Sequence, residues 1–355
     1  MIPFVVMLLV PILMQHIRVK GIPYQKKNQN ALLFFFLVYT LLLALRHEHI
    51  GTDTETYILF FERYAKMDWN AIQNVQFERG FIYLNKFISL LSTEPRFYLA
   101  AVAVLIGAMI YPTYRRLHSD TALTIVLYCV ISTFVMSFSG IRQMMAIGMG
   151  VVAYEFVRRK ELILFVLLVL LAVTFHNSAF LLAFMYPLYH ARITRKWLIT
   201  VIPILAVIFA LNEPIFSALG LILERYTRFE SEISNTGAYT MLILFVLFAV
   251  VSFVFPDEKK LDKETLGLRN FLLLSVVIQM FAPLHTLAMR MNYYYIIFIP
   301  LLIPKIIEAR SERWKQVAMT ARHVMVAFFL VYFFLSAYGE GSLDVFPYHF
   351  FWENV

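Results

Sequence analysis

The stretch that decides the fold is ALTIVLYCVISTFVMSFSGIRQMMAIGMGVVAYEFV, residues 122–157, in which two apolar runs flank the polar motif SGIRQ at residues 139–143. Each run has the composition of a membrane-embedded helix. Arg142 therefore stands at the mouth of a membrane segment, where a charge is costly and usually faces a cavity, a partner or a ligand. The alternative is an interfacial arginine that extends to lipid headgroups.

The composition of the whole chain agrees with this interpretation. Of its 355 residues, 61% are hydrophobic and 15% are charged, which indicates a helical protein with several membrane spans. Lys and Arg outnumber Asp and Glu by 31 to 23, but they lie in short loops between apolar runs, where they set topology. We therefore expect no nucleic-acid partner. The single cysteine, Cys129, excludes a disulfide or a cysteine metal site within one chain.

The basic loops order the apolar runs by the positive-inside rule. They predict an all-α, polytopic integral membrane protein with about twelve transmembrane helices, both termini outside, and a single transmembrane domain over residues 1–355. A single span over residues 162–189 is a competing interpretation, but it would put the basic residues that follow it outside. The predicted spans cover residues 1–14, 31–45, 97–111, 122–138, 145–157, 162–174, 179–189, 198–211, 239–255, 271–283, 293–303 and 324–338.

Two long polar loops, at about residues 46–96 and 212–238, are predicted to lie outside, the first because it mixes charges of both signs and the second because the preceding span runs outward. Within the first, residues 81–91 are apolar but too few to cross a hydrocarbon core that needs roughly 20. We expect them to form a juxtamembrane helix on the outer face. The charges of the second loop are Glu224, Arg225, Arg228, Glu230 and Glu232.

With this topology, unusual polar residues from distant parts of the chain gather at the outer leaflet. Arginines there suit a polyanion, because guanidinium groups bind phosphate oxygens in a bidentate fork and keep their charge. Carboxylates and a histidine beside them can move protons. The gathered residues are Arg46, Asp53, Glu78, Arg142, His176 and Arg290.

Each of these residues also has a purely structural interpretation. Asp53, in Thr-Asp-Thr, is typical of a helix cap, and Glu78 can form a surface ion pair with Arg79. The segment at residues 176–178 can satisfy backbone groups at a helical hairpin. Arg290 can be an interfacial anchor.

The polar motifs follow one another in a definite order. They are Gly51-Thr52-Asp53 with Tyr57 after Arg46, then the segments at residues 77–81, 139–143 and 175–179, and then Arg290 with Tyr294. In this order they resemble the EpsG-like family of bacterial exopolysaccharide and O-antigen polymerases, over residues 46–304. The resemblance implies a polytopic glycosyltransferase of the bacterial inner membrane, related to the Wzy-type polymerases, with a GT-C-like architecture and its chemistry on the periplasmic or exterior side.

The implied reaction transfers an oligosaccharide from undecaprenyl pyrophosphate to the non-reducing end of another lipid-linked repeat unit. Donor and acceptor are then both undecaprenyl pyrophosphate-linked oligosaccharides in a lipid bilayer, and a chain-length regulator and a flippase are candidate partners. Cationic groups lower the barrier because charge grows on the leaving pyrophosphate. Arginines can replace a metal in this role, so we expect no cofactor and no metal.

The residues receive roles as hypotheses. Asp53 leads as the base for the acceptor hydroxyl, with Glu78 and His176 as the other candidate catalytic groups. Tyr57, Ser178 and Tyr294 are assigned to the acceptor or sugar. The predicted pyrophosphate-binding residues are Arg46, Arg142, Gln143 and Arg290.

Three rival functions stay open at this point. A transporter or flippase for lipid-linked saccharides would need polar groups near the midplane and on both faces. A membrane O-acyltransferase acting on the same glycans would use His176 as its base, but it leaves the outer arginines without a task. A structural role in an envelope complex is the third.

Overall fold

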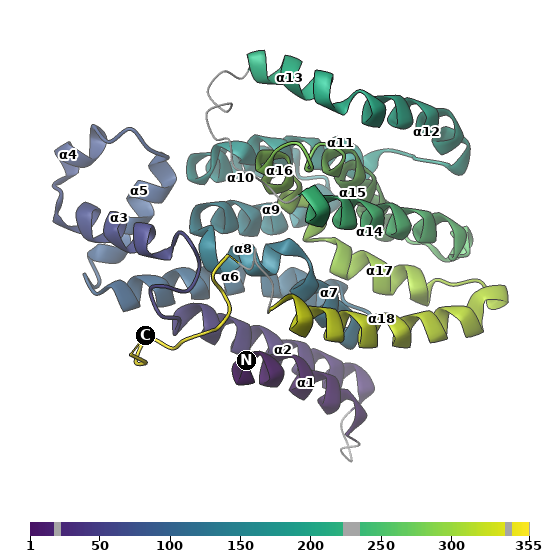
Figure 1. Ribbon diagram of the computed structural model, residues 1–355, viewed down its shortest axis with the longest axis horizontal. Coiled ribbons are helices and arrows are strands. Elements are labelled where there is room, and N and C mark those ends of the chain that lie inside the picture. The colour runs from purple at the N-terminus through teal and green to yellow at the C-terminus, as the bar shows by residue number, and fades with distance from the viewer. Residues whose placement is uncertain (18–22, 223–234, 338–342, 355) are drawn as a thin grey trace. The chain divides into compact units, whose positions relative to one another are not determined.

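The computed structural model describes residues 1–17, 23–222, 235–337 and 343–354 (Figure 1). These residues form helices and no strand, so the predicted all-α class is confirmed. The five charged residues predicted in the second outer loop, Glu224 to Glu232, lie outside the described residues, as does Tyr338 at the end of the last predicted span.

The chain forms two compact units, and each is described by itself. Unit 1 comprises Met1–Ala183 and Met319–Val355, and unit 2 comprises Phe184–Ala318. The single transmembrane domain expected over residues 1–355 stays a prediction.

Unit 1 contains the helices that carry most of the predicted site residues. In the first unit α2 packs against α1 and α6, α6 packs against α9, and α9 packs against α10. The helices are α1 (Ile2–His16), α2 (Tyr24–Ala44), α3 (Thr54–Lys66), α4 (Trp69–Gln73), α5 (Arg79–Ser89), α6 (Pro95–Leu117), α7 (Thr121–Val130), α8 (Ser132–Ser139), α9 (Ile141–Arg159), α10 (Leu162–Phe175), the 3-10 helix η1 (Asn177–Phe184) and α18 (Lys315–Ser336).

The core of unit 1 is aromatic. Tyr39 of α2 and Tyr128 of α7 are fully buried with ring centroids 5.5 Å apart, and Phe134 of α8 lies 5.7 Å from Tyr39. Aromatic contacts of this kind add to the burial of large apolar area. This cluster joins α2 to the consecutive helices α7 and α8.

The predicted span at residues 122–138 is not one straight helix, which corrects the sequence prediction. It is broken between α7 and α8, whose axes are bent by 56°. Ile131 has extended backbone dihedrals that end α7. The β-branched Val130 and Ile131 are followed by Ser132 and Thr133, residue types that weaken a helix interior by side-chain stiffness and by competing hydroxyls.

Four helices are long and apolar enough to cross a membrane, or up to seven if each of three bent pairs is one span, counted over the described parts of the chain. Two shorter apolar helices cover Ile2–Gln15 and Leu162–Phe175. The protein is therefore an all-α polytopic membrane protein. The number of twelve spans stays a prediction.

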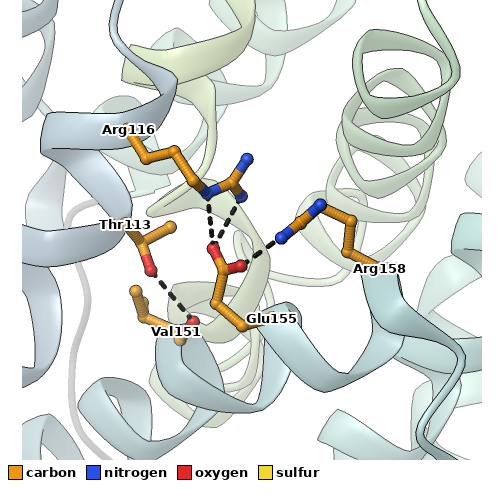
Figure 2. A network of polar contacts seen from close by, with 5 residues as sticks. All are labelled: Thr113, Arg116, Val151, Glu155 and Arg158. Carbon is orange, nitrogen blue, oxygen red and sulfur yellow. Dashed lines mark hydrogen bonds and ion pairs between the residues drawn. The ribbon is translucent and has the colours of Figure 1, made fainter.

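One end of unit 1 is basic, and an ion-pair network orders its helices (Figure 2). Glu155 of α9 accepts hydrogen bonds from Nε and Nη2 of Arg116 at 2.9 and 2.6 Å, and from Nε of Arg158 at 3.2 Å. Arg322 of α18 pairs with Asp120 at the start of α7. The carboxyl ends of α6 and α9 thus lie side by side, and we call Arg116, Arg158 and Arg322 the basic end.

The opposite ends of the same two helices adjoin α3. Tyr98, in the first turn of α6, stacks on Phe61 of α3 with ring centroids 4.6 Å apart. Arg142, in the first turn of α9, donates a hydrogen bond to Tyr57 of α3. Because α6 and α9 run parallel, the predicted outer motifs and the basic loops lie at opposite ends of unit 1. The predicted surface segment at residues 81–91 corresponds to α5, an eleven-residue helix.

Unit 2 contains shorter helices, and here the second predicted outer loop needs correction. Its described part is helical at both ends, because residues 212–222 form α13 and α14 already begins at residue 235. The apolar side chains after Pro214 continue the preceding helix after a bend of 71° instead of forming a polar loop. The helices are α11 (Met185–His190), α12 (Arg195–Ala210), α13 (Asn212–Ile222), α14 (Asn235–Val254), η2 (Glu258–Lys260), α15 (Lys263–Gln279), α16 (Thr286–Ile296), α17 (Ile299–Glu308) and η3 (Glu312–Trp314).

Candidate functional site

Two of the sequence motifs meet at the start of α3. The hydroxyl of Thr52 lies 2.7 Å from the hydroxyl of Ser139, and the backbone N–H of Asp53 donates to the same Ser139 oxygen at 3.2 Å. Ser139 is the last residue of α8, directly before the turn into α9. These hydrogen bonds hold the first turn of α3 against the junction of α8 and α9.

A glycine allows this close approach. Gly51 has a φ of +88°, and a Cβ atom there would lie 2.1 Å from the backbone oxygen of Phe138. Any other residue would be strained by the positive φ, which L-residues with a side chain rarely adopt. Its Cβ atom would also clash with the Phe138 oxygen. The Thr54 hydroxyl donates to that same Phe138 oxygen at 3.1 Å.

Arg142, in the first turn of α9, contacts the side chains of three residues from other segments. Its Nη1 donates to Oε2 of Glu78 at 2.7 Å, its Nε donates to the Tyr57 hydroxyl at 3.4 Å, and its guanidinium lies 4.4 Å from the ring centroid of Phe77. The side chains of Arg142 and Glu78 are 24% and 12% exposed. An ion pair so shielded from water is stronger than a surface pair, and the aromatic face adds a cation–π attraction.

His176 approaches the same carboxylate from the other side. Its Nδ1 lies 3.8 Å from Oε1 of Glu78, too far for a hydrogen bond but close for a charged pair. Gly80 makes this approach possible, because a Cβ atom there would lie 2.2 Å from the Thr174 hydroxyl and 2.7 Å from the Phe175 ring. Glu78 thus stands between Arg142 and His176.

The electrostatics keep this carboxylate charged. Burial raises the pKa of Glu78, but His176 and Arg142 more than compensate, and the net pKa lies below its ordinary value. Burial also raises the pKa of the Tyr57 hydroxyl, against the opposing effect of Arg142. At neutral pH the site therefore holds an ionised Glu78, which is a weak base, and a protonated Tyr57.

Asp53 differs from its structural interpretation as a helix cap. It directly precedes α3, but its side chain accepts no hydrogen bond from that helix, so the capping alternative is wrong. Only its backbone oxygen serves the helix, accepting from the Tyr57 N–H at 3.0 Å. The half-buried carboxylate has no hydrogen-bond or ion-pair partner within the described chain. Its negative charge contributes to the raised pKa of Tyr57.

These contacts bring together four of the sequence motifs in one cluster of unit 1, which we call the Arg142 centre. Its members are Asp53, Tyr57, Phe77, Glu78, Arg142 and His176.

The chain belongs to the EpsG family. The model of this family matches residues 30–350, nearly the whole chain, and so includes every motif of the Arg142 centre. The family indicates a membrane protein associated with exopolysaccharide. Neither the curated proteins nor the solved structures contain a match.

The other predicted site residues of this EpsG-family protein take part in none of the contacts described above for the Arg142 centre. Arg46 is 3% exposed and lines a different cavity. Gln143 and Ser178 are buried within unit 1. Arg290 and Tyr294 belong to unit 2, where both lie on helix α16. The sequence predicted Tyr294 in the span at residues 293–303 and Arg290 in the outer turn before that span.

An apolar groove of about 400 Å³ adjoins the Arg142 centre between α5 and α10. Its walls include Gly80, Tyr83 and Phe87 on one side and Phe175 on the other. Gly80 lies two residues after Glu78, and Phe175 directly precedes His176. The groove therefore begins where the charged cluster ends.

Two functional candidates of this EpsG-family site were missed by the sequence analysis. Phe77 lies against the Arg142 guanidinium, and Ser139 holds the start of α3. Both lie inside the motifs at residues 77–81 and 139–143, but the site residues were chosen mainly among ionisable groups, which an aromatic ring and a serine hydroxyl are not. No group of three or more His, Cys, Asp and Glu side chains in the described residues is arranged to hold a metal ion.

Proposed function

We propose that this EpsG-family protein is a polysaccharide polymerase, a glycosyltransferase that works without a metal ion or cofactor. It transfers an oligosaccharide from undecaprenyl pyrophosphate to the non-reducing end of another lipid-linked repeat unit. The observation that carries the proposal is Arg142, a shielded cation held between Glu78, Tyr57 and the Phe77 ring at one end of unit 1. Such a cation is suited to a leaving group on which negative charge develops.

The orientation follows from charge. The basic end of unit 1, with Arg116, Arg158 and Arg322, carries the residues that the positive-inside rule places in the cytoplasm. The Arg142 centre at the opposite end then faces the periplasm or the cell exterior. We extend this to a multi-pass protein of the bacterial inner membrane with about twelve spans and a GT-C-like architecture.

The reaction assigns one task to each group. A base takes the proton from the acceptor hydroxyl, whose oxygen attacks the anomeric carbon of the donor sugar. The bond from that carbon to the pyrophosphate oxygen breaks, and the electron pair stays on the pyrophosphate, where Arg142 stabilises it. Asp53 is our first choice as base, since its carboxylate is half-buried and unpaired among the described residues. His176 is the second.

Glu78 is better suited to positioning than to proton transfer. Its pKa lies below the ordinary value, so it binds a proton weakly, and it already holds Arg142 at 2.7 Å. We propose that Glu78 aims the guanidinium. Binding of pyrophosphate by Gln143 and Arg290, and of sugar by Tyr57, Ser178 and Tyr294, completes the proposed roles.

The apolar groove supports a substrate that is an amphiphile. Its walls come from α5 and α10, and it begins beside Glu78 and His176. A polyprenyl chain lying in this groove would present its pyrophosphate to Arg142, and the exposed Arg79 on the groove wall adds positive charge there. We further propose a chain-length regulator and a flippase as partners in the membrane.

The test is to change Arg142 to Ala and to Lys in the native host and to display the surface glycan on a gel. Arg63→Ala is the matched control, since Arg63 is an exposed arginine of α3 outside the centre. With normal expression, we expect Arg142→Ala to stop the glycan at one repeat unit and the control to make full ladders.

Three other outcomes would contradict the proposal. Full ladders from Arg142→Ala would show that the Arg142 centre does not take part in the reaction. Complete loss of surface units would favour a flippase. Full-length ladders that lack only acyl groups would favour an O-acyltransferase.

A further inference from the structure

A second cavity lies in unit 1, with a volume of about 500 Å³. Arg46, just after α2, forms part of its wall together with Arg96 in the first turn of α6 and Phe351 near the C-terminus. Ile58 of α3 closes another side. The cavity is built from four segments of the chain, at residues 46–48, 58, 94–99 and 351.

Arg46 is a buried cation without a counter-ion. Its side chain is 3% exposed, its Nη1 donates to the backbone oxygen of Leu43, and its Nε has no hydrogen-bond partner. None of the described carboxylates lies within ion-pair distance of it. Burial lowers the pKa of Arg46 to about 10, which still leaves it charged at neutral pH. An uncompensated buried charge is strongly unfavourable, so an anion in the cavity would stabilise the protein.

Two further features of the cavity favour an anion. Helix α6 begins at its wall with Pro95, and the helix N-terminus has no side-chain cap. The free N–H groups and the helix dipole make such an end attractive to negative charge. Arg96 is exposed, and its guanidinium lies 4.2 Å from the centroid of the Phe351 ring.

The cavity also holds two exposed carboxylates, Glu48 and Glu94, and the half-buried His47. The carboxylates repel a small bare anion, but they accept hydrogen bonds from hydroxyl groups. A ligand that carries both a phosphate and several hydroxyls satisfies the arginines and the carboxylates together. This combination is that of a phosphorylated saccharide.

The cavity is separate from the Arg142 centre, although both adjoin α3. Ile58 lines the cavity, whereas Tyr57 contacts Arg142, and successive residues of a helix point about 100° apart. Tyr98 is fully buried and within electrostatic reach of both Arg46 and Arg142. The two sites share none of their wall residues.

We propose that this cavity is a second binding site, for a phosphorylated saccharide whose phosphate meets Arg46 and Arg96 and whose hydroxyls meet Glu48 and Glu94. Its further assignment, as the site that holds the second lipid-linked substrate during transfer, rests on the proposed function. Arg46 then belongs to this site and not to the Arg142 centre.

The experiment measures binding of N-acetylglucosamine 1-phosphate to the full-length protein in phosphatidylcholine nanodiscs by titration calorimetry. We expect saturable binding to the wild type and to Arg63→Ala. Arg96→Ala should weaken it about tenfold, which corresponds to one lost charged hydrogen bond. Arg96 is exposed, so this variant leaves the fold intact. Arg46→Lys keeps the charge but loses the fork, and should weaken binding similarly.

Two comparisons decide the chemistry of the ligand. N-acetylglucosamine without phosphate and inorganic phosphate should each bind at least tenfold more weakly than the sugar phosphate. Glu94→Gln should weaken binding of the sugar phosphate and leave inorganic phosphate unchanged or tighter. Equal binding of inorganic phosphate and sugar phosphate would overturn the saccharide assignment, and so would displacement of the sugar phosphate by phosphatidylglycerol in the nanodisc.

The Arg142→Ala variant separates this proposal from the proposed function. We expect it to bind the sugar phosphate like the wild type, although it makes no polymer. Binding that is lost in Arg142→Ala and kept in Arg96→Ala would place the ligand at the Arg142 centre, and the second site would be refuted while the polymerase remained. The absence of any binding to the wild type would also refute the second site, whatever the glycan ladders show.

Discussion

The contact between Glu78 and Arg142 is open to a direct test, because changing Glu78 to Gln removes the negative charge and keeps the shape. Removal of one partner from a fully buried ion pair costs about 3–5 kcal/mol, and an exposed pair contributes only about 0–1 kcal/mol. The side chains of Glu78 and Arg142 are 12% and 24% exposed, and Oε2 of Glu78 lies 2.7 Å from Nη1 of Arg142. The burial of this pair therefore lies between the two cases. We expect Glu78→Gln to reduce the free energy of unfolding by about 2 kcal/mol.

The pH dependence of this stability has a definite sign. The pKa of Glu78 in the folded protein lies below its ordinary value of 4.5, so the unfolded state binds a proton more readily. The stabilisation by this carboxylate is fully present above pH 4.5 and is lost as the pH falls through the folded-state pKa. Wild type should therefore approach Glu78→Gln in stability as the pH falls from 7 toward 3.

The assay is thermal unfolding of the purified protein in detergent at several pH values, together with the glycan ladder from the native host. Glu62→Gln is the matched control, because Glu62 lies on α3, the helix that carries Tyr57, and forms no ion pair with any described residue. A variant Glu78→Gln that unfolds with the wild type at pH 7, or a difference that stays constant down to pH 3, would refute the reasoning. If Glu78 only positions Arg142, the Glu78→Gln variant should still make glycan ladders, although shorter ones. If Glu78 is the catalytic base, the same variant should make no ladder.

Three further changes test other parts of the structure. Gly51→Ala should lower the free energy of unfolding by about 2 kcal/mol or more, because the residue has a positive φ and its new Cβ atom would clash with a backbone oxygen. Gly237→Ala is the control, since a Cβ atom there has no neighbour within 4 Å and should not destabilise the protein. Thermal unfolding measures both variants. Phe77→Leu removes the cation–π contact with Arg142, worth about 1 kcal/mol, and should shorten the glycan ladders. Unchanged ladders would show that the Phe77 ring has no part in the reaction. Because the single native cysteine is buried, an impermeant maleimide added to intact cells or spheroplasts should label Thr93→Cys and not Arg159→Cys; the reverse pattern would invert the proposed orientation.

The membrane class and most helices of this protein follow from local patterns in the sequence. Apolar length and basic loops predicted the helical hairpin of α9 and α10, and an apolar run too short to span predicted α5. These features depend on the solvation of each segment alone, so no knowledge of its neighbours is needed. The break between α7 and α8 was not predicted, because Ser132 and Thr133 are the only polar residues there and the flanking runs have the apolar composition of one continuous span.

Only the tertiary structure decided which polar groups meet. The sequence placed Arg46 and Arg142 on one face, but packing put Arg46 in a cavity at the start of α6 and put Arg142 against Glu78. Helix approach decides such pairings, and at α5 and α10 that approach depends on Gly80, where a missing Cβ atom brings Glu78 close to His176. The sequence by itself determined the helical membrane class, and it predicted that unusual polar residues from distant segments would lie on one side of the membrane. Close packing between segments distant along the chain decided their partners, because a distance of a few ångström depends on the side chains of both helices together.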